Sequence, residues 1–171
     1  MIRTRYSAER LLDAPAAVVY HCLADYREHH RPEGFLPGQF SDLTVVRGGV
    51  GAGTVIRFSM TLGGRRRTVT TEISEPQPGR VLVERGSGLE TTFTVDPVGP
   101  QGEQARVRFD TVMEAGGLEG LLTRLFAARL LGPVYADELQ RLERYAQAHP
   151  TILPGAEQVR PLTPAPVPAP A

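Results

Sequence analysis

The sequence lacks lysine, asparagine and tryptophan, and it contains one cysteine, Cys22. A chain without lysine cannot form a lysine Schiff base and cannot supply the lysine of a phosphate-binding P-loop. A single cysteine cannot form an intramolecular disulfide, and we interpret Cys22 as a small buried apolar residue. These absences exclude several kinds of active site before any motif is considered.

The chain also lacks an excess of charge of one sign, because 19 basic residues balance 19 acidic residues. Proteins that bind nucleic acids or membrane surfaces usually carry a net positive field, which this chain lacks, although local patches stay open. We expect no nucleic-acid partner. No apolar run approaches the roughly 20 residues that span a membrane, and the charged N-terminus lacks the apolar centre of a signal peptide. We therefore expect a cytoplasmic protein without an integral membrane segment.

Length and composition predict one domain with an appendage. The 171 residues are 41% hydrophobic, which is enough to form a buried core without a disulfide or a metal. From residue 149 onward the composition shifts to proline interleaved with alanine and valine, as in polyproline-like or flexible chain. We place the domain at residues 1–148 and a Pro/Ala-rich flexible tail at residues 149–171.

Apolar and polar residues alternate with a period of two between residues 54 and 113, which predicts antiparallel strands with one apolar face. That face must be covered. On the short strand near residue 82 we assign Val81 and Val83 to this face, which gives Arg85 the same direction. The other residues assigned to the apolar face are Ile56, Phe58, Met60, Val69, Thr71, Ile73, Leu89, Thr91, Phe93, Phe109, Thr111 and Met113.

The cover is predicted between Leu118 and Gln147, where apolar residues recur at steps of three and four, as on one face of a helix. Glu138 falls among the polar positions outside this apolar stripe. Pro133 lies inside the pattern and removes a backbone hydrogen bond, so we expect a kink or an interruption near Leu131.

Two further segments carry a family resemblance. Residues 12–25 read as a strand that passes through Pro15 into a helix, and residues 44–58 contain a glycine run that leads into a strand. With the strands and the long helix, this order resembles the SRPBCC superfamily (START, polyketide cyclase and pollen-allergen-like proteins), in particular its polyketide cyclase/dehydrase-like branch. The resemblance covers about residues 2–147. It implies an α+β helix-grip fold, in which a curved antiparallel sheet of six to seven strands wraps around a long C-terminal helix, with two short helices after the first strand.

The resemblance also implies a cavity between the sheet and the long helix. We expect it to bind or carry a small hydrophobic molecule that is lipid-, polyketide- or quinone-like. The residues expected to line it are the twelve listed above from Ile56 to Met113, together with Leu122, Phe126 and Arg129. Two other functions stay open: a polyketide cyclase, aromatase or dehydratase that uses the same cavity without a metal or nucleotide cofactor, and modulation of another protein through the surface.

Candidates for catalysis are few. Tyr26, His29 and His30 lie on the segment that resembles the entrance of the family's pocket, where a tyrosine or histidine would act as general acid or base. Arg67 shares strand parity with the apolar face, as does Arg10 near the N-terminus, and an inward arginine would stabilise an enolate or phenolate. Each of these arginines is equally compatible with a strand end at which the side chain reaches water.

Two patterns resemble cofactor sites and are interpreted otherwise. The glycine run at residues 48–53 leads into a strand and not into a helix, so we read it as a hairpin connection and expect no nucleotide. His21, Asp25 and His29 are spaced four apart, which on one uninterrupted helix would bring them together as metal ligands. Because the first helix is expected to end near Asp25 and send His29 elsewhere, we expect no metal and no other cofactor.

Overall fold

The computed structural model describes residues 2–31 and 33–150, and within this part the side chains of residues 118–126 are outside the description. The expected lining residues Leu122 and Phe126 therefore lie outside the described side chains, as does nearly all of the expected tail. The elements follow in the order β1 (Ile2–Leu12), α1 (Ala16–Ala24), β2 (Phe40–Arg47), β3 (Val55–Leu62), β4 (Arg65–Gln77), β5 (Val81–Gly86), β6 (Leu89–Val98), β7 (Gln104–Ala115) and α2 (Gly117–Ala148).

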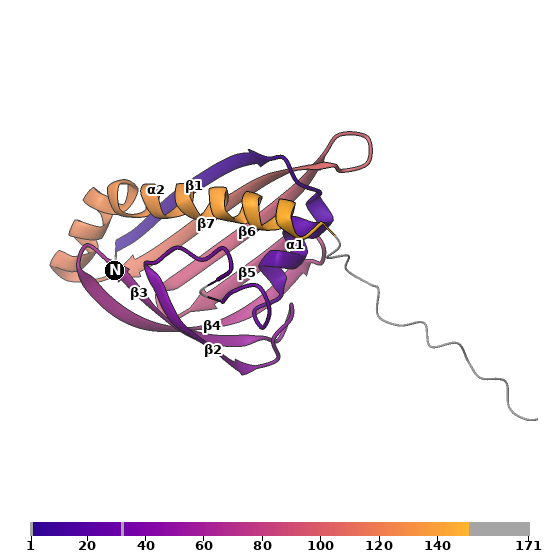
Figure 1. Ribbon diagram of the computed structural model, residues 1–171. Coiled ribbons are helices and arrows are strands. Elements are labelled where there is room, and N and C mark those ends of the chain that lie inside the picture. The colour runs from indigo at the N-terminus through magenta and orange to yellow at the C-terminus, as the bar shows by residue number, and fades with distance from the viewer. Residues whose placement is uncertain (1, 32, 151–171) are drawn as a thin grey trace, which may run out of the picture.

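All seven strands form one antiparallel sheet with the spatial order β1-β7-β6-β5-β4-β3-β2. Strands β2 to β7 follow one another as a meander, and β1 joins the edge beside β7. The sheet curves, and α2 lies across its concave face (Figure 1). This arrangement confirms the predicted α+β helix-grip fold. No helix in the described part of the chain is long and apolar enough to cross a membrane.

The segment between α1 and β2 differs from the expected pair of short helices. Helix α1 forms, and its described continuation over residues 25–39 consists of turns. The Asp25 carboxylate explains the change, because its Oδ1 accepts hydrogen bonds from the backbone N–H groups of Arg27 at 3.0 Å and Glu28 at 3.1 Å. Aspartate in such a turn competes with continuation of the helix, so α1 ends at this point.

Helix α2 continues through Pro133 without the interruption that the sequence suggested. Figure 1 shows the helix bend in its N-terminal part, and a proline inside a helix is a usual cause of a bend. Beyond the proline, α2 buries an apolar stripe against the sheet: Val134, Tyr135, Leu139, Leu142 and Ala146 are each at most 6% exposed. The straight part of α2 therefore covers the concave face as predicted.

The glycine loop, which we define as residues 48–54, joins β2 to β3 as the predicted hairpin connection. It also holds the end of α1, because the backbone N–H of Tyr26 donates to the Gly49 carbonyl and the backbone N–H of Gly51 donates to the Ala24 carbonyl, both at 2.9 Å. Gly51 has a φ of 60°, and a Cβ placed there would lie 2.3 Å from the Glu75 carboxylate. Both the backbone conformation and the close approach require glycine at this position.

Replacement of Gly51 by alanine tests this role of the loop. We expect Gly51→Ala to lower the free energy of unfolding by about 2–3 kcal/mol, because backbone strain adds to the clash with Glu75. Gly53→Ala is the matched control: Gly53 has a φ of 81°, but no atom lies within 4 Å of its Cβ position. It should cost about 1 kcal/mol from strain alone. Equal losses in urea denaturation of the two variants would contradict the close approach at Gly51.

Candidate functional site

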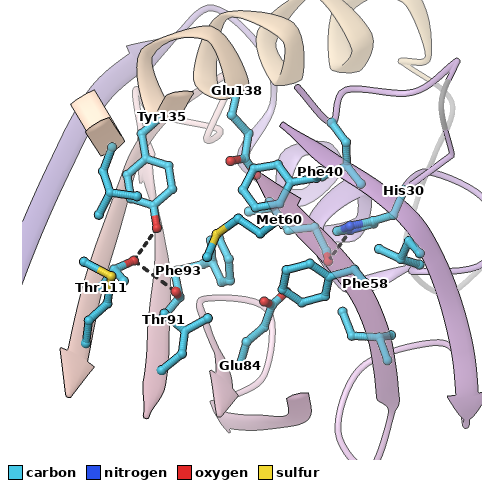
Figure 2. Close-up of a pocket in the computed structure, with 17 residues that line it drawn as sticks. His30, Phe40, Phe58, Met60, Glu84, Thr91, Phe93, Thr111, Tyr135 and Glu138 are labelled. Atoms are coloured by element: carbon cyan, nitrogen blue, oxygen red, sulfur yellow. Dashed lines mark hydrogen bonds between the residues drawn. The ribbon is translucent and has the colours of Figure 1, made fainter. Parts of the chain in front are cut away.

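A cavity lies between the concave face of the sheet and α2 (Figure 2). About 60 Å³ of its interior is open to the centres of water-sized spheres. One water molecule needs roughly 10–15 Å³ on this measure, so there is room for several waters or for a compact organic group. The 17 residues that line the cavity are Leu23, His30, Leu36, Phe40, Leu43, Ile56, Phe58, Met60, Glu84, Leu89, Thr91, Phe93, Thr111, Met113, Leu131, Tyr135 and Glu138.

Strands β3, β6 and β7 place most of their expected residues in this lining. The members found there are Ile56, Phe58, Met60, Leu89, Thr91, Phe93, Thr111 and Met113. Ile73 and Phe109 are instead enclosed in the core, at 1% and 0% exposure, and Phe109 packs its ring edge to face against Phe93 and Tyr135. Strand parity selects the concave face, but the depth of a residue in the core decides whether it reaches the cavity.

Three more expected lining residues lie elsewhere. Thr71 is 0% exposed, and Val69 is half-buried on the same strand, β4. Arg129 is exposed on α2. No β4 residue is in the lining, although β3 and β5 on either side of β4 both contribute to it.

The arginines expected to point inward are all on the surface. Arg67 pairs with Met60 in the β3–β4 register, but its side chain is exposed because it lies near the end of β4. Arg85 donates to Glu90 at 2.6 Å and Arg10 donates to Glu143 at 2.7 Å, both at the surface. The described lining contains no arginine, so all three arginines match the alternative in which the side chain lies at a strand end and reaches water.

Glu84 is a cavity residue that the sequence reading assigned to the wrong face. On β5, Leu82 and Glu84 face the concave side, so the assignment of Val81, Val83 and Arg85 to that side was inverted. The register confirms the direction, because Glu84 lies opposite Ile73 on β4 and opposite Thr91 on β6. Its Oε1 accepts a hydrogen bond of 2.7 Å from the Tyr26 hydroxyl.

Glu138 is the second carboxyl group in the lining, and it comes from α2. It is 5% exposed, although its charge suggested a position outside the apolar stripe. Leu131, Tyr135 and Glu138 follow one another at steps of four and three, so they share one helix face. Within the described residues, the Glu138 side chain has no hydrogen bond and no ion pair. Figure 2 shows Glu138 and Glu84 directed into the cavity from opposite sides.

Glu84 and Glu138, which we call the carboxyl pair, both hold their protons unusually strongly. Burial raises the pKa of Glu84 to about 7, against a smaller lowering by the Tyr26 hydrogen bond. Burial, together with the smaller effect of the charges of Glu84 and Asp137, raises the pKa of Glu138 to about 8. The Glu84 residue as a whole is half-buried. Part of its exposed surface faces the cavity and not bulk water, so its carboxyl group can be strongly desolvated. Near neutral pH the carboxyl pair is therefore partly protonated.

Hydroxyl groups form a second polar region of the cavity. The Tyr135 hydroxyl lies 2.5 Å from Thr111 Oγ1, which lies 2.9 Å from Thr91 Oγ1 (Figure 2). Burial raises the pKa of Tyr135 above its ordinary value, so the phenol stays neutral. Tyr135 was missed because its position in the apolar stripe gave no sign of a polar role. A chain of neutral hydroxyls can donate to or accept from a carbonyl or hydroxyl of a bound molecule.

His30 lies where the cavity meets a groove on the outside of the domain. This outer groove, about 740 Å³ on the same measure, shares His30, Leu36, Phe40 and Leu43 with the cavity. Burial lowers the pKa of His30 to about 4, and its Nε2 lies 2.9 Å from the Leu23 carbonyl, so the neutral ring donates that hydrogen bond. A histidine held in this state is poorly suited to act as an acid or base near neutral pH.

Tyr26 and His29, the other two catalytic candidates, are not in the lining. Tyr26 is 2% exposed, supports Glu84 from behind, and stacks on His30 with ring centroids 4.3 Å apart. His29 places its Nδ1 2.9 Å from the Tyr145 hydroxyl, outside the cavity. Their arrangement gives Tyr26 the role of positioning Glu84 and gives His29 no contact with the cavity.

His21, Asp25 and His29 do meet, although the end of α1 was expected to separate them. The chain stays on the same side after Asp25 because the His29 N–H donates to the Asp25 carbonyl at 3.3 Å. One potential ligand atom from each residue lies within 4.8 Å of the others, and His21 Nε2 lies 3.9 Å from Asp25 Oδ2. Ligands of tetrahedral zinc lie about 3.3 Å apart, given bonds of about 2.0–2.1 Å. The three groups are therefore more widely spaced than zinc ligands.

Comparison with known proteins points to one family. A family model described as polyketide cyclase / dehydrase and lipid transport matches residues 3–147. A search of curated proteins gives no significant match.

Solved structures support the same fold. The solution structure of KanY protein is 26% identical, has a TM-score of 0.70, and covers 86% of this chain and 99% of its own. The Zhui aromatase/cyclase from Streptomyces sp. R1128 is 14% identical with a TM-score of 0.64, covering 86% and 95%. Norcoclaurine synthase from Thalictrum flavum, solved in complex with dopamine and hydroxybenzaldehyde, is 15% identical with a TM-score of 0.62, covering 86% and 88%.

The spacing of His21, Asp25 and His29 generates a prediction about metals. We expect purified protein to contain no stoichiometric zinc, iron or other transition metal, because binding would require the three side chains to close together and Tyr145 already engages His29. Elemental analysis measures the metal content, and addition of a chelator should leave the melting temperature unchanged. One tightly bound metal ion per chain that is lost in His29→Gln would show the expectation to be wrong.

The raised pKa of Glu138 predicts how stability depends on pH. Between the unfolded pKa, about 4.3, and the folded pKa, about 8, the unfolded chain binds fewer protons than the folded one, so stability falls as pH rises. Glu138→Gln removes this loss. The variant should match the parent protein to within about 1 kcal/mol at about pH 5 and be more stable by at least about 2 kcal/mol at about pH 8.5.

Urea denaturation across this pH range measures the effect, and Glu33→Gln provides the control because Glu33 is exposed. That control should leave the pH dependence unchanged. A Glu138→Gln variant that is destabilised equally at every pH would contradict the raised pKa and indicate a structural role for the carboxylate.

Proposed function

The chain belongs to the polyketide cyclase/dehydrase and lipid transport family, and from this premise we propose that it binds a small, largely apolar molecule in the cavity between the sheet and α2. The observation that carries the proposal is the lining itself: apolar side chains from the sheet and both helices surround a few polar groups. Small-molecule sites have this composition, in which apolar surface supplies affinity and a few polar groups orient the ligand.

The size of the cavity supports a ligand with one compact end. The inner volume accommodates a ring or a short chain, and the outer groove continues beyond His30 and Phe40. A longer lipid-, polyketide- or quinone-like molecule would extend into this groove when the shared side chains move. The hydroxyls of Tyr135, Thr111 and Thr91 would then meet a carbonyl or hydroxyl at the inner end.

A second candidate function is cyclisation or dehydration of a polyketide-like substrate in the same cavity. One observation favours it: Glu84 and Glu138 both face the cavity, with pKa values raised to about 7 and about 8. A protonated carboxyl and an ionised one can act as general acid and general base near neutral pH. Likeness to the aromatase/cyclase supports the fold for this function, and the chemistry would come from the carboxyl pair.

Binding of 1-naphthylmethanol, a neutral fluorescent alcohol of compact size, tests the proposed function. We expect stoichiometric binding that Thr91→Phe weakens by at least about tenfold, because the added ring fills the cavity at a packing cost of about 1–3 kcal/mol. Thr92→Phe is the matched control, since the neighbouring residue of β6 points to the opposite face. It should keep the affinity within about threefold of the parent protein.

Fluorescence titration measures these affinities, and circular dichroism checks that both variants fold. Failure of the parent protein to bind the alcohol, or equal binding by Thr91→Phe and the parent protein, would contradict the cavity as the binding site. Conversion of a bound polyketide-like substrate that is lost in Glu84→Gln or Glu138→Gln would instead favour the cyclase or dehydratase function.

A further inference from the structure

We propose that the ligand of this cavity carries a cationic nitrogen, an ammonium group on an otherwise apolar molecule, held between the carboxyl groups of Glu84 and Glu138. The inference rests on the proposed ligand-binding function and names the chemical class of the ligand. The two carboxyl groups come from β5 and α2, which face each other across the cavity (Figure 2).

The Glu84 carboxyl group is held in place, and neither carboxyl group of the pair has a counter-charge among the described residues. Tyr26 donates to Oε1 of Glu84 and fixes that side chain, and the other oxygen has no hydrogen-bond partner among the described residues. Glu138 is 5% exposed and has no hydrogen bond or ion pair within the part of the chain that the structure describes. Buried acids are usually paired, and an unpaired one costs stability that an apolar residue would not cost.

No side chain of the described lining can supply a positive charge. The lining contains no arginine, and its one histidine, His30, is neutral because burial lowers its pKa to about 4. Many of the described arginines pair with acids at or near the surface, as Arg85 does with Glu90. The pair of acids is thus a negative site enclosed in an apolar cavity. Such an arrangement indicates a role in binding a ligand and not a role in stabilising the fold.

An ammonium group satisfies this site better than a neutral or anionic group. It has three N–H donors, so one nitrogen can donate to both carboxylates and still reach a third acceptor. Phe40 and Phe58 line the same cavity as the two carboxyl groups, and aromatic faces attract cations. An anionic ligand would be repelled, and a neutral one would leave at least one carboxyl group without a counter-charge.

Binding of the cation is linked to proton release. Because the carboxyl pair is partly protonated near neutral pH, an ammonium group that binds ionised carboxylates must displace protons. The other titratable groups near the pair are Tyr26, Tyr135, His30 and Asp137. Burial raises the pKa of both tyrosines and lowers that of His30, so none of these three changes charge near neutral pH. Affinity for the ammonium should therefore rise between about pH 6 and about pH 8.

Two probes of matched shape test the proposal: 1-naphthylmethylamine, which is an ammonium ion at neutral pH, and 1-naphthylmethanol, which is neutral. By calorimetry at about pH 8, we expect the parent protein to bind the amine at least about tenfold more tightly than the alcohol. Glu84→Gln and Glu138→Gln should each reduce amine affinity by at least about tenfold and keep alcohol affinity within about threefold. Glu33→Gln is the exposed control and should change neither affinity.

Proton release gives an independent readout. Calorimetry at about pH 7 in buffers of different ionisation enthalpy should detect release of about one proton with the amine and none with the alcohol. Equal affinity of the parent protein for both probes, or amine binding that survives in both glutamine variants, would overturn the cationic ligand and leave the cavity as the binding site. Binding of neither probe would overturn the proposed function as well.

Discussion

The apolar concave face of the seven-stranded sheet must be shielded from water, and α2 is the one long element in the described chain that can do so. The straight part of α2 cannot follow the curved sheet closely along its whole length, so the contact is closest at some places and open at others. Leu139, Leu142 and Ala146 fill one end of this interface, at no more than 2% exposure. The space left beside Tyr135 and Glu138 is the cavity.

The polar groups of that cavity depend on contacts outside it. The glycine loop holds the end of α1 through Gly49 and Gly51, which fixes the backbone at Tyr26. Tyr26 in turn donates to Glu84 and packs against His30. One chain of backbone and side-chain hydrogen bonds thus runs from a surface hairpin to a carboxyl group in the cavity. Burial in this enclosure is the largest cause of the unusual protonation of Glu84.

The sequence predicts the fold and much of the lining because long strands alternate unambiguously. Strands β3, β6 and β7 each contain at least four residues of one parity with apolar side chains, so Phe58, Phe93 and Thr111 could be assigned to the concave face. The short β5 begins with three consecutive apolar residues, and the β4–β5 register shifts between Ser74 and Gln77. Parity was therefore ambiguous there, and the inverted choice hid Glu84.

Glu138 was not predicted for a different reason. Burial of an isolated acid is rare, so its charge favoured an exposed position even though its spacing from Leu131 and Tyr135 places it on the buried face of the helix. The turn at Asp25 was also misjudged: the helix ends there as expected, but the backbone hydrogen bond from His29 keeps the chain on the same side. Local patterns predict the type of an element more reliably than the path of the chain at its end. The cavity around Glu138 is built by residues far apart in the sequence, whereas the hydrogen bond at Asp25 joins residues only four apart.

The carboxyl groups of Glu84 and Glu138 share an apolar cavity without a counter-charge from the described lining, and they keep protons near neutral pH. Infrared difference spectroscopy of the ligand-free protein measures this directly, because protonated carboxyl groups absorb apart from carboxylates. We predict a protonated-carboxyl signal that disappears over one broad range between about pH 6 and about pH 9, because the two titrations overlap. The signal should be missing from the Glu84→Gln/Glu138→Gln double variant. Complete ionisation of both groups by about pH 5.5, as for exposed glutamates, would contradict the account.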